Sequence, residues 1–299
     1  MKPMRSVLFV PAHRAGWAAK AAAKGADGVI IDLEDSVPTH LKDEGRVTGA
    51  AQIADVAAAY PDLGVYVRLN AFETGLTGDD IAAVLVPGLN GVLLPKSFGA
   101  NDIVALDALI THFERKGGLA SGSVEIIIPL ETAQAYNDCE AMLKASPRVQ
   151  TLFAGTARDA DVSRSFGFEF TPGGEETLFM RSRVIMACRA NGFNHPLVGV
   201  WQDLQDPDGA RNFALMNRRL GYRGMVLIHP SHIDMANEVF TPSEQDVLFY
   251  QGMIDAFEAA EKEGLAAIVY EGMHVDYAHI KTAREVVGLY ELLTRRKAS

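Results

Sequence analysis

Residues 125–132 read EIIIPLET and residues 151–159 read TLFAGTARD, two apolar runs that each lead into small or polar residues and an acid. This pattern predicts two buried strands. Enzymes of the α/β class place their chemistry just past the C-terminal ends of such strands. Glu131 and Asp159 are therefore expected to converge on one hard cation, which would make the chain a metal-assisted enzyme.

Similar β-rich runs recur along the chain, separated by longer stretches of helical character. The eight runs cover residues 6–11, 28–32, 65–70, 91–96, 125–130, 151–155, 196–201 and 224–229. Helices are expected between them, for example over residues 13–26, 102–116 and 175–191. Eight strand–helix alternations predict an α/β fold of the (β/α)8 TIM-barrel type. No dinucleotide-binding or P-loop glycine signature follows a run, which disfavours an open nucleotide-binding sheet.

The pattern changes after residue 240. The stretch TPSE at residues 241–244 predicts a helix start, with Thr241 as the cap and Glu244 completing a capping box. A helix to about residue 263, a short hairpin around Glu271 and Gly272, and a last helix over residues 277–293 should follow. We therefore expect a barrel domain over residues 1–240 and a helical C-terminal extension over residues 241–299, serving as a lid or an oligomer contact.

Composition excludes several classes of protein. The chain has 299 residues and a net charge of −10, which argues against nucleic-acid and membrane-surface binding but leaves room for an anionic substrate in a local positive cleft. No run approaches the roughly 20 apolar residues of a membrane span, and no signal peptide is visible. Cys139 and Cys188 have no metal-binding or redox spacing, which fits a cytoplasmic location.

Polar residues end several of the predicted strands and should meet at one face of the barrel. They are the acids of Asp32-Leu33-Glu34-Asp35, together with Arg68, Asn70, Lys96 and His229. Arg68 interrupts an apolar run, so it forms a structural ion pair with Glu34 or Asp35, clamps a substrate anion, or does both, with the acids orienting its guanidinium. Lys96 could act as a Schiff-base lysine, as a stabiliser of negative charge or in a structural salt bridge.

Six short motifs, taken in order, carry a resemblance to a known family. They read FVPAHR at 9–14, DLEDSVP at 32–38, VRLN at 67–70, LPK at 94–96, LETA at 130–133 and IHP at 228–230. Together they resemble the citrate lyase β-subunit-like family, within the wider group of HpcH/HpaI aldolases and malyl-CoA lyases. The resemblance extends from Arg5 to about Asp276, so it covers nearly the whole chain.

The resemblance implies a Mg²⁺ ion held by Glu131 and Asp159, with water and a 2-oxo acid filling its other positions. The family usually shows Gly-x-x-Asp at the second ligand, whereas this chain reads GTARD at residues 155–159 and is one residue longer. Asp161 is therefore a competing ligand. From the residues alone, Asp159 could instead cap the following helix.

The resemblance also implies roles for other side chains. Arg68 is expected to contact the substrate and to act in catalysis, with Glu34 beside it, and Lys96 to stabilise negative charge. Arg14 is expected to contact the phosphates of coenzyme A, although a solvated helix start is the plainer interpretation. Asp276 is expected to act as an acid or base in the active site of a neighbouring subunit, unless it only caps the last helix.

The implied function is a Mg²⁺-dependent carbon–carbon lyase acting on a 3-hydroxyacyl thioester of the malyl-CoA, citramalyl-CoA or citryl kind. Three alternatives stay open: an aldolase for free 4-hydroxy-2-oxo acids, a thioesterase for the same esters, and a non-catalytic subunit that binds CoA or an acyl carrier. The expected partners are an acyl-CoA or 2-oxo acid substrate, further copies in a homotrimer or hexamer, and an acyl-carrier subunit.

Overall fold

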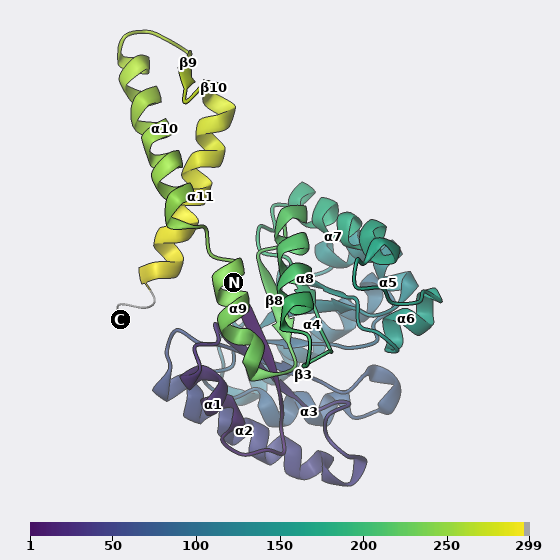
Figure 1. Ribbon diagram of the computed structural model, residues 1–299. Coiled ribbons are helices and arrows are strands. Elements are labelled where there is room, and N and C mark those ends of the chain that lie inside the picture. Colours follow the sequence, from purple (N-terminus) through teal and green to yellow (C-terminus); the bar gives the residue numbers. More distant parts are fainter. Residues whose placement is uncertain (296–299) are drawn as a thin grey trace. The chain divides into compact units, whose positions relative to one another are not determined.

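Eight parallel strands close into a barrel in which each strand pairs with the next along the chain and β8 returns to β1 (Figure 1). The strands are β1 Ser6–Pro11, β2 Gly28–Asp32, β3 Gly64–Arg68, β4 Gly91–Leu93, β5 Glu125–Leu130, β6 Val149–Gly155, β7 Leu197–Gly199 and β8 Gly224–Leu227. This computed structural model describes residues 1–295. It confirms the predicted TIM barrel, and each predicted run overlaps one strand, although β3 and β6 begin one and two residues before their runs.

Helices alternate with the strands as expected. They are α1 Trp17–Ala23, α2 Lys42–Ala59, α3 Thr77–Val84, α4 Ala100–Gly117, α5 Ala133–Lys144, α6 Asp161–Phe166, α7 Leu178–Ala190, α8 Pro207–Leu220 and α9 Ile233–Val239. The helix predicted over residues 13–26 is shorter in the structure, because the chain turns first and reaches α1 through Gly16 at φ 76°. Such a left-handed conformation favours glycine and ends the turn.

Each strand sends one large apolar side chain into the interior of the barrel. Together with Met4, these residues form one buried cluster: Val7, Ile30, Tyr66, Leu93, Ile127, Phe153, Leu197 and Val226. Two glycines make room for Met4, because a Cβ at Gly28 or Gly64 would come within 2.7 Å of its sulfur. The interior is therefore a packed core, and a ligand must bind above it, at the loops.

A buried ion-pair cluster ties α4 to the start of β6. The Arg148 guanidinium donates to both oxygens of Glu114 at 2.7 and 2.6 Å and to Asp107 at 2.6 Å. Backbone N–H groups of Gly122 and Val124 donate to the same glutamate at 3.0 Å. Burial alone would raise the pKa of Glu114, but these donors lower it to about 2, compared with the ordinary value of 4.5.

Replacing Arg148 should destabilise the barrel strongly. We expect Arg148→Met to lower the free energy of unfolding by about 3–5 kcal/mol, because Glu114 would stay buried without its cation. Since the pKa of Glu114 is lowered in the folded state, its contribution is present above pH 4.5 and is lost as the pH falls towards 2. Urea unfolding at several pH values tests both points. Lys144→Met, which removes an exposed pair with Glu140, is the control and should cost less than about 1 kcal/mol; equal losses would contradict this account.

The chain divides into two compact units, residues 1–238 and residues 239–299. The second unit contains α10 Glu244–Lys262, an antiparallel hairpin of β9 Ala267–Tyr270 and β10 Met273–Asp276, and α11 Tyr277–Arg295. The predicted order of helix, hairpin and helix is confirmed. Its core contains Met253, Ile254, Phe257, Val275, Ile280 and Ala283. No helix within residues 1–295 is long and apolar enough to cross a membrane.

The predicted start of α10 is wrong by two residues. Ser243, not Thr241, is the cap: its side chain accepts from the backbone N–H of Asp246 at 3.0 Å, and Asp246 accepts in return from the N–H of Ser243 at 3.4 Å. The capping box therefore uses Asp246 in place of Glu244. Both registers present a hydroxyl followed three residues later by an acid, so the sequence pattern does not separate them.

Candidate functional site

Arg68 lies at the centre of the polar cluster above the barrel core. Its guanidinium makes a two-point contact with Asp32, at 2.7 and 2.8 Å, and a third contact with Glu34 at 2.9 Å. Its side chain is 13% exposed and that of Asp32 is 1% exposed. The sequence pointed to Glu34 or Asp35 as partners and missed Asp32. The feature that would have identified Asp32 is the parallel register of β2 and β3, which sets Asp32 directly beside Arg68.

Burial and charge act against each other in this cluster. Burial would raise the pKa of Asp32, but the neighbouring Arg68 lowers it overall, so Asp32 is a carboxylate. For Glu34 burial is the stronger effect and raises the pKa to about 7, although Arg68 and Lys96 oppose it. The face of Phe9 lies 4.7 Å from the Arg68 guanidinium carbon. Arg68 is thus held by two acids and an aromatic ring, and its orientation is fixed before any ligand binds.

Lys96 links the first acid cluster to the later strand ends. Its ammonium lies 2.6 Å from Glu34, 3.3 Å from Asp35 and 3.5 Å from Asp161. Burial would lower the pKa of Lys96, but the hydrogen bond to Glu34 and the other acids raise it overall. A Schiff-base lysine needs a lowered pKa. The surrounding acids therefore favour Lys96 as a fixed positive charge. They disfavour the Schiff-base role that the sequence left open for it.

Glu131 follows β5 and faces the same cluster. One of its oxygens accepts from the backbone N–H of Lys96 at 2.9 Å, and the other lies 4.0 Å from Arg68. Burial raises the pKa of Glu131. Lys96 adopts φ 52°, a strained value for a residue with a side chain, and this turn aims its N–H at the carboxylate. Glu131 thus keeps one oxygen for a ligand.

The structure separates the two candidates for a second metal ligand. Asp161 begins α6, has a side chain 27% exposed, and lines the same cavity as Glu131. Asp159 is exposed, adopts φ 54°, and is not among the residues that line this cavity. It is not a helix cap either, because Ala160 holds the cap position of α6. The loop therefore brings Asp161, rather than Asp159, to Glu131.

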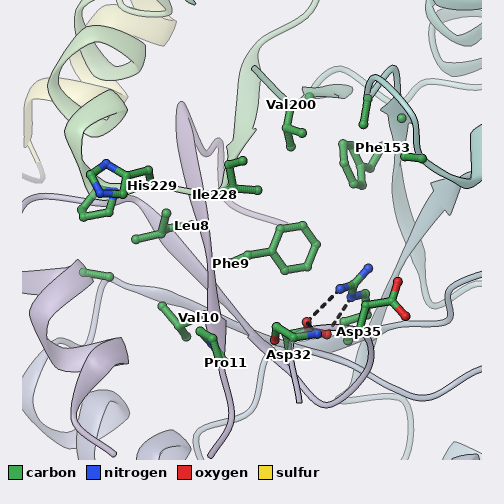
Figure 2. Close-up of a pocket in the computed structure, with 18 of the residues that line it drawn as sticks. Leu8, Phe9, Val10, Pro11, Asp32, Asp35, Phe153, Val200, Ile228 and His229 are labelled. Atoms are coloured by element: carbon green, nitrogen blue, oxygen red, sulfur yellow. Dashed lines mark hydrogen bonds and ion pairs between the residues drawn. The ribbon is translucent and has the colours of Figure 1, made fainter. Parts of the chain in front are cut away.

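The cavity has a volume of about 750 Å³ and lies at the C-terminal ends of the strands (Figure 2). Its charged lining comprises four acids and three cations: Asp32, Asp35, Glu131, Asp161, Arg68, Lys20 and Lys24. Apolar side chains make up much of the remainder, among them Leu8, Phe9, Val10, Phe153, Val200 and Ile228, which Figure 2 shows around the opening. A mostly apolar cavity with a few converging charges is typical of a small-molecule site.

Three further residues singled out from the sequence have different surroundings. Arg14 is exposed in the turn after β1 and does not line the cavity, whereas Lys20 of α1 and Lys24 at the C-terminal cap of that helix do. His229 lines the cavity with its Nδ1 2.7 Å from Ser231. Asp276 belongs to the second unit, where it accepts from the N–H of Ala278 at 2.9 Å and so caps α11; its catalytic role stays a prediction.

The two carboxylates of Glu131 and Asp161 fit a Mg²⁺ ion that takes its remaining ligands from outside the protein. Within residues 1–295, no three His, Cys, Asp or Glu side chains are grouped so that they could hold a metal ion by themselves. Glu131 and Asp161 offer two carboxylates, and Mg²⁺ commonly binds through one or two carboxylates while water and substrate oxygens complete its octahedron. A metal at this site would therefore leave coordination positions open for water and for substrate oxygens.

Comparisons with known proteins found a matching family model and several similar proteins. Residues 5–230 match the HpcH/HpaI aldolase/citrate lyase family. An L-malyl-CoA/β-methylmalyl-CoA lyase of Cereibacter sphaeroides is 34% identical, over 98% of this chain and 96% of its own. A citrate lyase subunit beta-like protein of Deinococcus radiodurans is 35% identical, over 95% and 96%. The solved structure of CitE from Mycobacterium tuberculosis with magnesium, acetoacetate and coenzyme A covers 100% of this chain and 98% of its own, at 25% identity and a TM-score of 0.71.

Proposed function

Because the chain belongs to the HpcH/HpaI aldolase/citrate lyase family and is a carbon–carbon lyase, we propose that it cleaves, and in reverse forms, a 3-hydroxyacyl-CoA thioester in a Mg²⁺-dependent reaction. The observation that carries the proposal is the placement of Glu131, Asp161 and Arg68 on one cavity. Two carboxylates without a third ligand suit a cation that shares its shell with substrate, and the arginine supplies a positive charge beside them.

The proposed reaction breaks one carbon–carbon bond without net oxidation. A base removes the proton of the 3-hydroxyl group, and the electrons of the bond between carbons 2 and 3 pass to the acyl fragment. This fragment leaves as a thioester enolate, which is then protonated, and the other fragment is a 2-oxo acid. When bound, Mg²⁺ would supply Lewis-acid polarisation of the keto and carboxylate oxygens of that acid.

The side chains of this protein then have defined tasks. Arg68 stabilises the enolate oxygen electrostatically, and the fixed contacts with Asp32 and Glu34 remove the cost of orienting it during the reaction. Lys96 balances the negative charge of Glu34 and Asp161. Asp276 remains our proposal for an acid or base that a neighbouring subunit donates within a homo-oligomer, and the second unit is its carrier.

Asp161 should matter more for metal binding than Asp159. We expect Asp161→Asn to raise the Mg²⁺ concentration for half-maximal activity by about 10–100-fold, the range seen when metal sites lose supporting contacts. Asp159→Asn changes an exposed residue of the same loop and should shift it less than about 2-fold. Calorimetric titration of the two metal-free variants with MgCl₂ should give the same ranking, with weaker Mg²⁺ binding by Asp161→Asn than by Asp159→Asn. The reverse order of effects would return the ligand role to Asp159.

The lining lysines favour a CoA thioester over a free 4-hydroxy-2-oxo acid. Lys20 lies on α1 and Lys24 at the C-terminal cap of that helix, beside exposed Trp17, and all three line the cavity. Two ammonium groups and an indole offer contacts for phosphates and a purine, which a free acid lacks. We expect Lys20→Ala/Lys24→Ala to raise the KM for the thioester about 10-fold with little change in kcat. Arg14→Ala is the matched control, and a larger effect there would restore the sequence prediction.

A direct assay tests the proposed function. Purified protein with Mg²⁺ should release acetyl-CoA or another acyl-CoA from malyl-CoA, citramalyl-CoA or citryl-CoA. Release of free CoA instead would identify a thioesterase. Turnover of a free 4-hydroxy-2-oxo acid with no thioester activity would favour the aldolase alternative, and activity that appears only with a co-purified acyl carrier would identify a subunit of a larger lyase.

A further inference from the structure

The loop that follows β7 holds the loop that carries Asp161. Resting on the proposed function, we propose that Gln202 is a positioning residue for Mg²⁺ binding: its side-chain amide clamps the backbone of Arg158 and so fixes Asp161, which begins α6 shortly afterwards. Gln202 does not line the cavity. It therefore acts through the backbone of the neighbouring loop and not by contact with the metal or the substrate.

The loop between β6 and α6 makes a strained turn just before Asp161. Residues 156–160 separate the end of β6 from that acid. At the start of the loop, the N–H and hydroxyl groups of Thr156 both donate to the carbonyl of Gly199, at 2.9 and 3.1 Å. Further along, Asp159 adopts φ 54°, a left-handed conformation that persists only where surrounding contacts hold it. The direction in which the chain enters α6 therefore depends on what holds the residue before this turn.

Gln202 supplies that contact with both ends of its side-chain amide. Its Oε1 accepts from the backbone N–H of Arg158 at 2.6 Å, and its Nε2 donates to the carbonyl of the same residue at 3.1 Å. The parallel pairing of β6 with β7 reaches only as far as Gly155 and Gly199. Because a side-chain amide carries the same donor and acceptor as a peptide group, Gln202 continues this pairing past the ends of both strands. Both backbone groups of Arg158 are thus satisfied and fixed.

Gln202 follows a buried aromatic anchor. The preceding residue, Trp201, is 4% exposed, and its ring centroid lies 5.9 Å from those of Phe213 on α8 and of Phe170. The Arg158 guanidinium in turn lies 5.1 Å over the ring of Phe170. Arg158 is therefore attached twice to the same anchor, by its backbone through Gln202 and by its side chain through Phe170. A supporting residue held by packing in this way can impose its position on a neighbouring ligand.

The ion pairs of the Asp161 carboxylate do not replace this clamp. Lys96 lies 3.5 Å from it, and Arg164 also pairs with it but belongs to the same helix and has a side chain 80% exposed. An exposed pair is weak, and one within α6 cannot fix where α6 begins. Ser165 accepts from the backbone N–H of Ala133 at 2.9 Å, which ties α6 to the start of α5. The side of the loop that faces β7 is left to the glutamine.

Calorimetric titration of the metal-free, full-length protein with MgCl₂ tests this proposal without any substrate. Gln202→Met keeps the length of the side chain and removes both hydrogen bonds to Arg158. We expect the Kd for Mg²⁺ to rise by about 10-fold, the lower end of the range seen when metal sites lose supporting contacts. Gln205→Met makes the same substitution at another exposed position of the same loop and should change the Kd by less than about 2-fold. An unchanged Kd in Gln202→Met would overturn the proposal.

A double-mutant cycle shows whether the effect passes through Asp161. In an Asp161→Asn background, Gln202→Met should alter the Kd by less than about 2-fold, because the carboxylate that it positions is already gone. An equal loss of affinity in both backgrounds would overturn the proposal. Mg²⁺ binding by the natural protein without thioester turnover would overturn the proposed function alone, since the cycle uses no substrate. Failure of the natural protein to bind Mg²⁺ would overturn both.

Hydrogen exchange measured by mass spectrometry separates positioning from a general loss of stability. Because Gln202 is exposed, its substitution should cost the barrel little stability. We expect the backbone amides of residues 156–161 to exchange at least about 10-fold faster in Gln202→Met, while the amides of β5 and β6 keep their protection. Faster exchange throughout β5 and β6 would show that Mg²⁺ affinity falls with the fold as a whole, and it would overturn the proposal.

Discussion

Glu131→Gln should abolish Mg²⁺-dependent activity. We expect kcat/KM to fall by about 1,000-fold or more, because the variant loses a charged metal ligand while its amide still fills the same space. The measurement is acyl-CoA release at Mg²⁺ concentrations from micromolar to tens of millimolar. A deficit that persists at the highest Mg²⁺ concentration is the expected result, since a neutral amide cannot replace the carboxylate.

Glu140→Gln supplies the matched control. Glu140 lies on α5, the helix that follows Glu131, but it faces solvent and pairs with Lys144 at 2.6 Å. This variant should retain full activity and the Mg²⁺ dependence of the natural protein. Full activity of Glu131→Gln at ordinary Mg²⁺ concentrations would show that Glu131 is not a metal ligand. Asp161 would then also lose its support as the second ligand.

Arg68→Met should damage both catalysis and stability. The substrate loses a preorganised positive charge, which we expect to lower kcat by about 100–1,000-fold. Asp32 stays buried without its cation, while Glu34 keeps only Lys96, so the free energy of unfolding should fall by about 3–5 kcal/mol. Activity per folded molecule, measured after correction by near-ultraviolet circular dichroism, separates these two effects.

Two further variants show whether the activity loss is specific. Arg68→Lys keeps the charge but loses the two-point contact with Asp32, so it should fold better than Arg68→Met and still lose at least about 10-fold in kcat. Arg5→Met breaks another buried pair, in which Arg5 and Asp27 lie 2.7 Å apart near the starts of β1 and β2. It should lose stability without losing activity per folded molecule. Comparable activity losses in Arg5→Met and Arg68→Met would reduce Arg68 to a structural role.

The fold could be predicted because the same pattern, an apolar run followed by a helical stretch, recurs along the chain. Strands buried on both faces need continuous apolar runs, and eight such runs with helices between them leave few alternatives to a closed barrel. The exact ends were harder. The run at residues 91–96 continues past the end of β4 at Leu93, because the chain turns there to reach Lys96 at φ 52°. That turn is a tertiary feature, and no local pattern encodes it.

The site could be predicted only in part, for a related reason. The residues at the strand ends were visible as polar interruptions of apolar runs, and Arg68, Glu131 and Lys96 do come together. Their partners depended on register, so Asp32 was missed beside Arg68. The choice between Asp159 and Asp161 depended on where α6 begins, because a shift of two residues decides which acid reaches the cavity. Helix starts are among the least determined features of a sequence.

The most direct measurement of the central claim is a product balance. Protein freed of metal by a chelator is incubated with malyl-CoA or citramalyl-CoA, with and without Mg²⁺, and both products are quantified by chromatography. We expect no turnover without metal and, with Mg²⁺, equal amounts of an acyl-CoA whose thioester is intact and of a 2-oxo acid. Free CoA without a 2-oxo acid, or equal turnover in the absence of divalent metal, would contradict it.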